Sequence, residues 1–453
     1  MAAQQPAGER LTTHRPPAAG QKFDRDGRPT RLLPVAQLIQ ISLYWFGLTV
    51  VWAGWEILGQ ERIEEFFDRT SAPAALGAME AIAVVMAIAV QPTVGTISDY
   101  TISRWGRRKP YIFIGTILDA FFLLAIALSA SAPAFFIALL GLQFSSNFAQ
   151  GPFQGYVPDL VPEPQVGLAS GLAGLAQVFG NIAGTVIIVG GFVVFADYFW
   201  PTIALGVVEL ATMLGTVCWV REGRSAKPRQ GRSWVAIARE AWATDVLRER
   251  DYAWLVASRF FFLTGTGLLI NTQVFYLERS LGLEGDEKAF WIGVSTVIFG
   301  LTALVVILPS ARISDRVGRK PVIWSACLSG ALGLSLVAIA PGIPLVLPGV
   351  TLLAAAAGIF LAVDWAFMTD VIPKISAGRY MGLSNVATAS ATAAAPALGG
   401  VVISLTTIPF GLAAGPRFAE LTGVLLFAIA ALLLRPVRDR VHEARLRAGS
   451  SAS

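Results

Sequence analysis

The chain has 453 residues, of which 55% are hydrophobic and only 14% are charged. A soluble domain carries roughly 25% charged residues, and the mean hydropathy of this chain is +0.62. This composition excludes a cytosolic enzyme and a disordered chain, and the only two cysteines, Cys218 and Cys327, are too few for a disulfide scaffold. The sequence therefore predicts an integral membrane protein.

Twelve apolar segments are long enough to cross a bilayer. A hydrocarbon core about 30 Å thick needs roughly 20 helical residues at about 1.5 Å rise per residue. We expect all the spans to be helices, because an open strand edge leaves backbone groups unsatisfied in lipid. The predicted fold class is thus an all-α membrane protein. In chain order, the predicted spans cover residues 33–59, 73–97, 110–131, 133–157, 166–194, 198–220, 253–278, 289–311, 321–340, 344–369, 379–408 and 416–435.

Polar segments divide the chain into five parts. Residues 1–32 form a polar, Pro-rich tail rather than a cleaved signal peptide. The two stretches that contain six spans each are 33–220 and 253–435, and they are joined by a basic linker at 221–252. A second basic tail covers residues 436–453.

The distribution of Lys and Arg predicts the orientation, because positively charged loops stay on the cytoplasmic side of a membrane. With the N-terminus inside, 29 of the 35 Lys and Arg residues lie in cytoplasmic segments and 5 lie in outer loops. The remaining one, Arg259, lies within a span. Both termini are therefore predicted to be cytoplasmic, and the net charge of +5 reflects topology rather than nucleic-acid binding.

Two local motifs recur in both six-span stretches. The segment PDLVPEPQVG at 158–167 matches TDVIPKISAG at 369–378, at an offset of 211 residues. The segment SDYTISRWGRRKP at 98–110 likewise matches SDRVGRKP at 314–321. Repeated bundles with a binding site at their interface are a common plan of secondary transporters. We therefore expect two pseudo-symmetric six-helix bundles.

The loop pattern Asp–x–x–Gly–Arg–Arg/Lys resembles the loop motif of the major facilitator superfamily. Its longer form at 98–111, with Asn147, Gln150-Gly151-Pro152 and Asp159-Leu160, is similar to the sucrose-transporter branch and the neighbouring glycoside–pentoside–hexuronide symporters. The resemblance covers about residues 33–435. It implies a sugar or glycoside carrier that is coupled to a cation, H⁺ or Na⁺.

Two positions depart from this branch. Tyr100 stands where the loop motif usually has Arg. Gln143 stands seven residues before the Gln-Gly-Pro, where plant-type sucrose carriers have an Asp. If that Asp carries the coupling proton in the relatives, its replacement by Gln143 argues against proton symport through this position.

The recurring loops are candidate cytoplasmic gates. Glycine allows a tight turn, and an Asp at a helix C-terminus needs a cationic partner because the helix dipole disfavours it. The resemblance implies that such contacts latch the halves together on the inner side when the cavity opens outward; alternatively, the charges only set the topology. The gate candidates are Asp99, Arg104, Gly106, Arg107 and Arg108 in the first loop, and Asp315, Gly318 and Arg319 in the second.

Ionisable residues inside the spans are candidates for ion coupling, since each costs roughly 2.5–3.5 kcal/mol at a helix centre. Both histidines, His14 and His442, lie in the tails, so a carboxylate is the expected proton carrier. Near the span ends, snorkelling is an alternative role for Glu56, Glu80 and Arg259. The candidate coupling residues are Glu56, Asp119, Glu209 and Asp364, and the last two are possible partners of Arg259.

Polar and aromatic stripes indicate a substrate cavity. Ser42, Trp45, Thr49, Trp52 and Glu56 fall on one helical face, because they are spaced by three and four residues. An amide stripe (Gln143, Asn147, Gln150, Gln154) follows the same rule on the fourth span. The alternatives are hydrogen bonds between packed spans and interfacial Trp anchors. The candidate substrate-binding residues are Trp45, Trp52, Gln143, Asn147, Gln150, Arg259 and Gln273.

Taken together, these patterns predict a secondary active transporter of a sugar or glycoside in the plasma (cell inner) membrane, working by alternating access. Its partners would be the small-molecule substrate, H⁺ or Na⁺ and the lipid bilayer, with no nucleic acid. We expect neither enzymatic activity nor a cofactor, because the sequence has no phosphate-binding loop and no Cys or His cluster for a metal. Two alternatives stay open: a proton-driven exporter of drug-like compounds, and a non-transporting membrane assembly or pigment-delivery factor.

Overall fold

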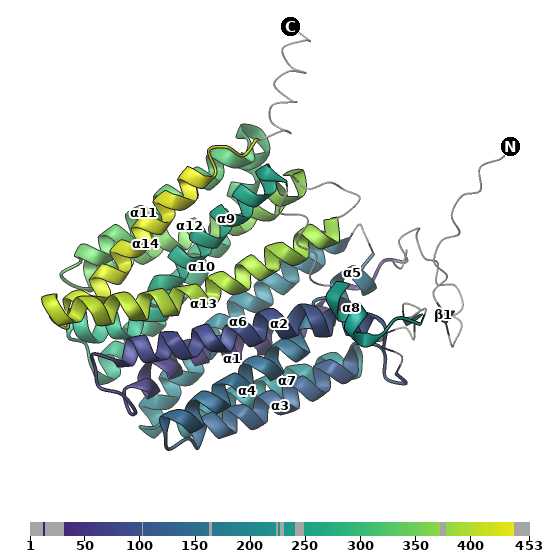
Figure 1. Cartoon of the computed structure of the whole chain (residues 1–453), viewed down its shortest axis with the longest axis horizontal. Helices are drawn as coiled ribbons and strands as arrows, with labels where there is room; N and C mark the ends of the chain where they lie inside the picture. The colour runs from purple at the N-terminus through teal and green to yellow at the C-terminus, as the bar shows by residue number, and fades with distance from the viewer. Residues whose placement is uncertain are drawn as a thin grey trace, which may run out of the picture.

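The structure is a computed structural model that describes residues 12–13, 31–101, 103–162, 165–222, 225–226, 231–240, 249–371 and 377–438. Within these ranges, twelve helices are long and apolar enough to cross a membrane, and they lie side by side as long rods (Figure 1). This confirms the predicted all-α membrane fold. The helices are α1 (Val35–Ile63), α2 (Ala72–Asp99), α3 (Lys109–Ala127), α4 (Ala132–Phe153), α6 (Val166–Phe195), α7 (Phe199–Trp219), α9 (Arg250–Phe275), α10 (Gly285–Val317), α11 (Arg319–Ile339), α12 (Ile343–Val371), α13 (Ala377–Phe410) and α14 (Ala414–Leu433).

Short elements complete the description. A π-helical turn, η3 (Tyr276–Ser280), continues α9 directly. The short helices α5 (Tyr156–Leu160) and α8 (Trp234–Glu240) lie beyond the long helices at one end of the bundle (Figure 1). Two-residue strands, β1 (Thr12–Thr13) and β2 (Ser225–Ala226), pair antiparallel outside the membrane helices. Hydropathy does not predict these elements because they are too short to form an apolar span.

Some helices are longer than the predicted spans. Helix α10 covers Gly285–Val317, whereas the apolar window alone predicted residues 289–311. Asp286 and Glu287 lie in its first turn and Arg316 lies in its last turn. These charges complement the helix dipole and stabilise turns that project beyond the hydrocarbon core.

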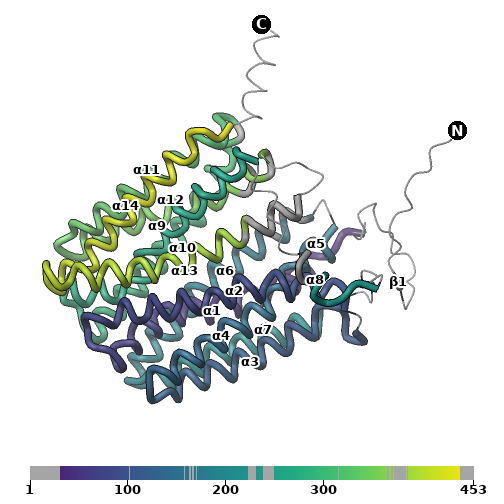
Figure 2. The backbone as a smooth tube through the Cα atoms, viewed as in Figure 1, coloured from purple at the N-terminus to yellow at the C-terminus, as the bar shows by residue number. Residues whose placement is uncertain are grey.

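The helices pack as two groups that meet along a few pairs. In the first group α1 packs on α6 and α7, and α3 packs on α4 and α7; in the second, α9 packs on α13 and α14, and α11 packs on α12 and α14. The groups meet where α2 packs on α13, α6 on α10 and α1 on α9 (Figure 2). We refer to α1–α7 as the first half and to α9–α14 as the second. The exact domain boundaries at 220–221 and 252–253 stay a prediction.

Close backbone contacts join the halves toward one end of the bundle. Gly77 on α2 approaches the backbone of Pro396 on α13, and Gly400 on α13 approaches that of Pro73 on α2, with no room for a Cβ at either glycine. We call this the distal end; it carries residues 64–71 and 281–284. The opposite end, which carries α5 and α8, is the proximal end.

Candidate functional site

Aromatic and amide side chains form a row on α1 and α4. Trp52 on α1 is half-buried, and its indole Nε1 donates a 3.1 Å hydrogen bond to the Ser146 hydroxyl on α4. Beside Ser146, Asn147 donates a 3.2 Å hydrogen bond to Oε1 of Gln143, and both amides are nearly fully buried. Trp45 lies half-buried two turns before Trp52. These four predicted residues therefore combine flat apolar rings with hydrogen-bonding groups.

The other predicted binding residues are more widely spread. Gln150 is half-buried on α4, one turn past Asn147. Gln273 and Arg259 lie on the same helix, α9, but they are 14 residues apart, which corresponds to about 21 Å along the axis. Gln273 is close to the distal end of the bundle. The structure thus does not bring all seven predicted residues to one place.

A buried ion pair lies in the second half. The Arg259 guanidinium on α9 forms an ion pair with Asp364 on α12. Its Nε and Nη2 also donate hydrogen bonds of 3.1 and 3.0 Å to the Thr388 hydroxyl on α13. Arg259 is 6% exposed and Asp364 is 1% exposed. Three helices of the second half therefore meet at this charge cluster, and Asp364 rather than Glu209 is the partner of Arg259.

A second buried cluster, in the first half, contains only acidic and hydroxyl groups. Asp119 on α3 and Glu209 on α7 are fully buried and hydrogen-bonded to each other. The Ser145 hydroxyl on α4 donates to Oδ1 of Asp119. The Tyr44 hydroxyl on α1 donates to Oε1 of Glu209 over 3.1 Å and lies 2.5 Å from the Thr116 hydroxyl. Four helices thus surround the carboxyl pair.

Other membrane carboxyls lie apart from this pair. Glu80 on α2 accepts a 3.0 Å hydrogen bond from Nε1 of Trp55, and both Glu80 and Glu56 are half-buried. Glu420 on α14 is fully buried and accepts a 3.0 Å hydrogen bond from Thr272 on α9. Glu420 was not among the predicted coupling residues, although it lies inside the predicted span 416–435, where the cost of a buried charge also marks it as a candidate.

The first gate motif forms a compact charge network at the proximal end. Nη2 of Arg108 lies 2.8 Å from Oδ1 of Asp99, and its Nε lies 2.6 Å from Oδ2 of Asp159. Arg107 also pairs with Asp159, and Gly106 turns the chain with φ of +125°. These contacts join α2, the start of α3 and α5 within the first half. The latch role of the motif stays a prediction.

Half-buried Glu222 extends this network beyond the end of α7. It accepts a 2.9 Å hydrogen bond from the backbone N–H of Arg108 and another from the Tyr156 hydroxyl. Burial raises the pKa of Glu222 above its ordinary value, although these two hydrogen bonds oppose the shift. Burial acts to lower the pKa of Arg108, but the neighbouring Asp159 and Asp99 raise it on balance.

The second gate motif has a simpler local geometry. Gly318, with φ of +98°, links α10 to α11. Nη1 of Arg319 donates a 2.6 Å hydrogen bond to the Ser314 hydroxyl. The backbone of Asp315 lies in α10, whereas its side chain is outside the described set. Arg104 of the first motif is exposed.

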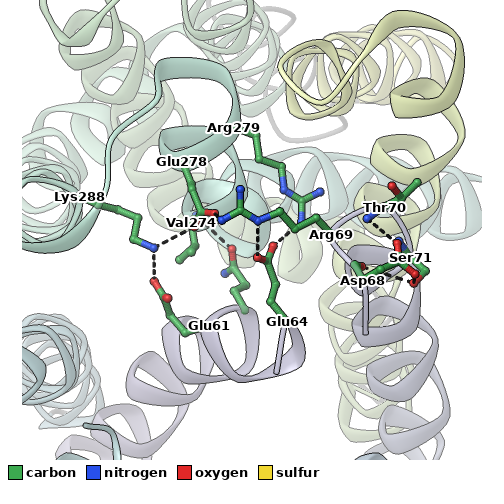
Figure 3. A network of polar contacts seen from close by, with 11 residues as sticks. Glu61, Glu64, Asp68, Arg69, Thr70, Ser71, Val274, Glu278, Arg279 and Lys288 are labelled. Carbon is green, nitrogen blue, oxygen red and sulfur yellow. Dashed lines mark hydrogen bonds and ion pairs between the residues drawn. The ribbon is translucent and has the colours of Figure 1, made fainter. Parts of the chain in front are cut away.

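Ion pairs bridge the two halves at the distal end (Figure 3). Glu64, which follows α1, pairs with Arg279 on η3. Arg69 in the next loop lies 3.2 Å from Glu278 on η3. Lys288 on α10 lies 2.9 Å from Glu61 on α1. Because each pair takes one member from each half, the network holds the distal ends together.

Polar backbone contacts reinforce this closure. Gln60 on α1 accepts a 3.1 Å hydrogen bond from the backbone N–H of Val274 on α9. Beside it lies a pocket of about 80 Å³ that is lined by Glu61, Tyr198 and Lys288. From the sequence, the cationic residues of this end were predicted only as part of the outer loops. No periodic signal relates Glu64 to a residue 215 positions later, so the pairing was not predictable.

The twelve long apolar helices that the structure describes are those of a multi-pass membrane protein. A family model described as Major Facilitator Superfamily matches residues 37–396 and 255–451. The chain belongs to the major facilitator superfamily, which confirms the resemblance of the loop motifs, and it is a transporter rather than an enzyme.

Two curated relatives refine the comparison. The chain is 31% identical over 122 residues to Sucrose transport protein SUT1 of Oryza sativa subsp. japonica, a match that spans 22% of this chain and 23% of that protein. It is 27% identical over 381 residues to the Uncharacterized symporter YnaJ of Bacillus subtilis, which spans 78% of this chain and 79% of the relative. The likeness to the sucrose transporter is therefore local, whereas the likeness to YnaJ extends over most of both chains.

Solved transporter structures share the fold. The nucleoside transporter NupG has a TM-score of 0.65 at 16% identity, with 88% of this chain and 98% of that chain covered. The D-xylose-proton symporter has a TM-score of 0.66 at 17% identity, with 89% and 98% covered. At these identities the likeness establishes the fold alone.

Proposed function

We propose that the protein is a secondary active transporter that moves a sugar or glycoside by alternating access, coupled to a cation. The observation that carries this proposal is the Trp52 indole, held by Ser146 beside the Gln143–Asn147 amides. A flat apolar ring next to hydrogen-bonding groups suits a pyranose, which presents an apolar face and a rim of hydroxyls. The sucrose transport proteins among the relatives support the same substrate class, and the uncharacterized symporter supports coupled transport.

The proposal includes an orientation for this conformation. By the Lys and Arg distribution, the proximal end is cytoplasmic. The bridging ion pairs lie at the distal end, which is then the outer one. We therefore interpret the structure as a state closed to the outside. In the opposite state, the first gate motif would take up its latch role.

Uptake into proteoliposomes tests the proposal. We expect accumulation of at least one labelled sugar from a panel of mono- and disaccharides, driven by an imposed H⁺ or Na⁺ gradient. Replacing Trp52 by Ala should lower uptake about tenfold, which corresponds to about 1.4 kcal/mol. The matched control is Trp219→Ala, because Trp219 is 61% exposed at the end of α7.

Two results would contradict this function. If no sugar accumulates under either gradient, the sugar-carrier proposal is wrong. Proton-driven efflux of lipophilic dyes in the same vesicles would then favour the exporter, which Gln143 at the position of the sucrose-carrier Asp also favours. If Trp52→Ala and Trp219→Ala behave alike, the aromatic face is not the binding surface.

A further inference from the structure

The carboxyl pair in the first half has unusual surroundings. Asp119 and Glu209 are both 0% exposed. One oxygen of each carboxyl, Oδ2 of Asp119 and Oε2 of Glu209, receives no N–H or O–H donor from any other described residue. These side chains are nevertheless hydrogen-bonded to each other. Because a carboxylate has no proton to donate, this contact requires at least one shared proton.

The neighbouring helices direct hydroxyl donors at the pair. The titratable group that faces the pair from α1 is Tyr44, and α4 contributes only the hydroxyl of Ser145. No Lys or Arg among the described residues forms an ion pair with either carboxyl. Two ionised carboxylates in contact would repel each other strongly in a low-dielectric core. A proton is therefore what holds Asp119 and Glu209 together.

The geometry suits a proton better than a metal ion. Ser145 and Tyr44 direct hydroxyl hydrogens at the carboxyl oxygens, whereas a cation would need several oxygen lone pairs directed at it. Among the described residues, no group of three or more His, Cys, Asp or Glu side chains could hold a metal ion. The hydroxyl donors around the pair therefore favour proton binding over metal binding.

The helices that hold the pair also carry the proposed substrate face. On α4, Ser145 donates to Asp119 while the next residue, Ser146, accepts the Trp52 indole N–H. On α1, Tyr44 donates to Glu209 while the next residue is Trp45. Consecutive helical residues point about 100° apart, so one helix can touch both sites. A change in the carboxyl pair therefore acts on the same helices that contact substrate.

We propose that Asp119 and Glu209 together form the proton-binding site of this transporter. The pair alternates between a monoanion that shares one proton and a neutral form that holds two. Binding of H⁺ changes its charge from −1 to 0 and makes or breaks no other covalent bond. This inference rests on the proposed transport function and specifies its coupling ion and its coupling residues.

Infrared difference spectroscopy of the purified full-length protein tests proton binding without any substrate. Across a pH titration, we expect a carboxylic acid C=O band that is altered by Asp119→Asn and by Glu209→Gln alike, because the residues share the proton. The control is Glu420→Gln, which removes another fully buried carboxyl, in the second half. If the pH-dependent band survives both first-half variants, the inference is overturned.

Transport assays then test coupling. In proteoliposomes that accumulate a labelled sugar, Glu209→Gln should reduce accumulation driven by a pH gradient at least tenfold more than sugar exchange at equal pH. Tyr44→Phe removes the hydroxyl that donates to Glu209 but keeps the ring, so it should shift the pH midpoint of accumulation. Because this variant keeps the packing of the ring, it tests the site even if Glu209→Gln fails to fold. Equal losses of exchange and accumulation, with no shift for Tyr44→Phe, would indicate a structural role only.

These outcomes separate the two proposals. If wild-type protein transports no sugar but the infrared band responds as expected, the sugar proposal fails and the proton site stands. If sugar accumulates on a Na⁺ gradient alone and the variants do not alter it, the proton site fails and the sugar carrier stands.

Discussion

The two halves of the molecule bury charge in different ways. In the first half, Asp119 and Glu209 contact each other with hydroxyl neighbours. In the second half, Arg259 and Asp364 form an ion pair across α9 and α12. The first arrangement changes its charge by binding a proton, whereas the second is fixed because a guanidinium stays protonated. Two bundles of one architecture can therefore differ in role, with ion coupling in the first half and a structural ion pair in the second.

At the repeat offset of 211 residues, Glu209 corresponds to the buried Glu420, but the other three charged positions differ between the halves. The counterparts of Arg259 and Asp364 are Leu48 and Phe153, which are both buried in one apolar cluster of the first half. The counterpart of Asp119 is Gly330, and the Phe427 ring occupies the place of its side chain. The second half therefore has no room for a carboxyl there.

The largest effect is expected from breaking the ion pair of the second half. Asp364→Ala leaves the Arg259 guanidinium buried without its carboxylate, and such a change costs about 3–5 kcal/mol. We expect a marked loss of thermal stability of the purified protein, measured by unfolding in detergent. Arg259→Met with Asp364→Leu should recover most of the loss, because apolar residues of similar volume often replace a buried ion pair without cost.

Two outcomes would contradict this interpretation of the ion pair. If Asp364→Ala is as stable as wild type, the charges are solvated in the membrane protein. If the double variant is less stable than the single one, apolar packing cannot replace this pair. The apolar counterparts Leu48 and Phe153 would then be no guide to what the second half tolerates.

A smaller effect is expected where the halves meet at the distal end. Arg279→Ala removes the partner of Glu64, so the closed state should lose about 1–2 kcal/mol, or about tenfold in population. The readout is labelling of Ile292→Cys by an impermeant maleimide in a background that lacks Cys218 and Cys327. Ile292 is 1% exposed and lines the distal pocket.

The matched control for this prediction is Arg417→Ala. Arg417 lies at the same end but donates to carbonyls of the second half only, those of Ala338 and Ala340 among them. Exchanging the charges, with Glu64→Arg and Arg279→Glu together, should restore slow labelling. Fast labelling in the control, or no rescue by the exchange, would refute the bridging role.

The carboxyl pair should tolerate the loss of its charge better than the ion pair does. Asp119→Asn with Glu209→Gln keeps hydrogen-bonding groups of the same size and leaves no buried cation behind. We therefore expect a stability change below about 1 kcal/mol in the same unfolding assay. A loss as large as that of Asp364→Ala would mean that the acidic pair is structural, and the contrast between the halves would disappear.

The sequence was most informative about features that follow from local chemistry. Apolar length predicted the twelve spans, and the cost of charge in lipid selected Asp119, Glu209, Arg259 and Asp364. Their pairing depends on which helices are neighbours, and no pattern within one span reports this. The Glu64–Arg279 pair was not predicted either. Both residues lie at helix ends, where a charge has a low energetic cost and therefore does not stand out in the sequence. Gln273 was grouped with Arg259 as a candidate binding residue, but the two lie roughly 21 Å apart along α9.

The smallest expected effect concerns pH and the proximal network of the first half. Burial raises the pKa of Glu222 in the folded protein above its value in the unfolded chain, so the folded state binds more protons between those two values. Stability should therefore fall as pH rises through that window, and Glu222→Gln should flatten the slope of the unfolding temperature against pH. The matched control is Glu287→Gln, which changes an exposed residue in the first turn of α10 and should keep the wild-type slope.

An unchanged slope in Glu222→Gln would mean that the hydrogen bonds from Arg108 and Tyr156 offset the effect of burial on the pKa of Glu222 completely. The contrast of the first half with the second would then rest on the Asp119–Glu209 pair and not on Glu222.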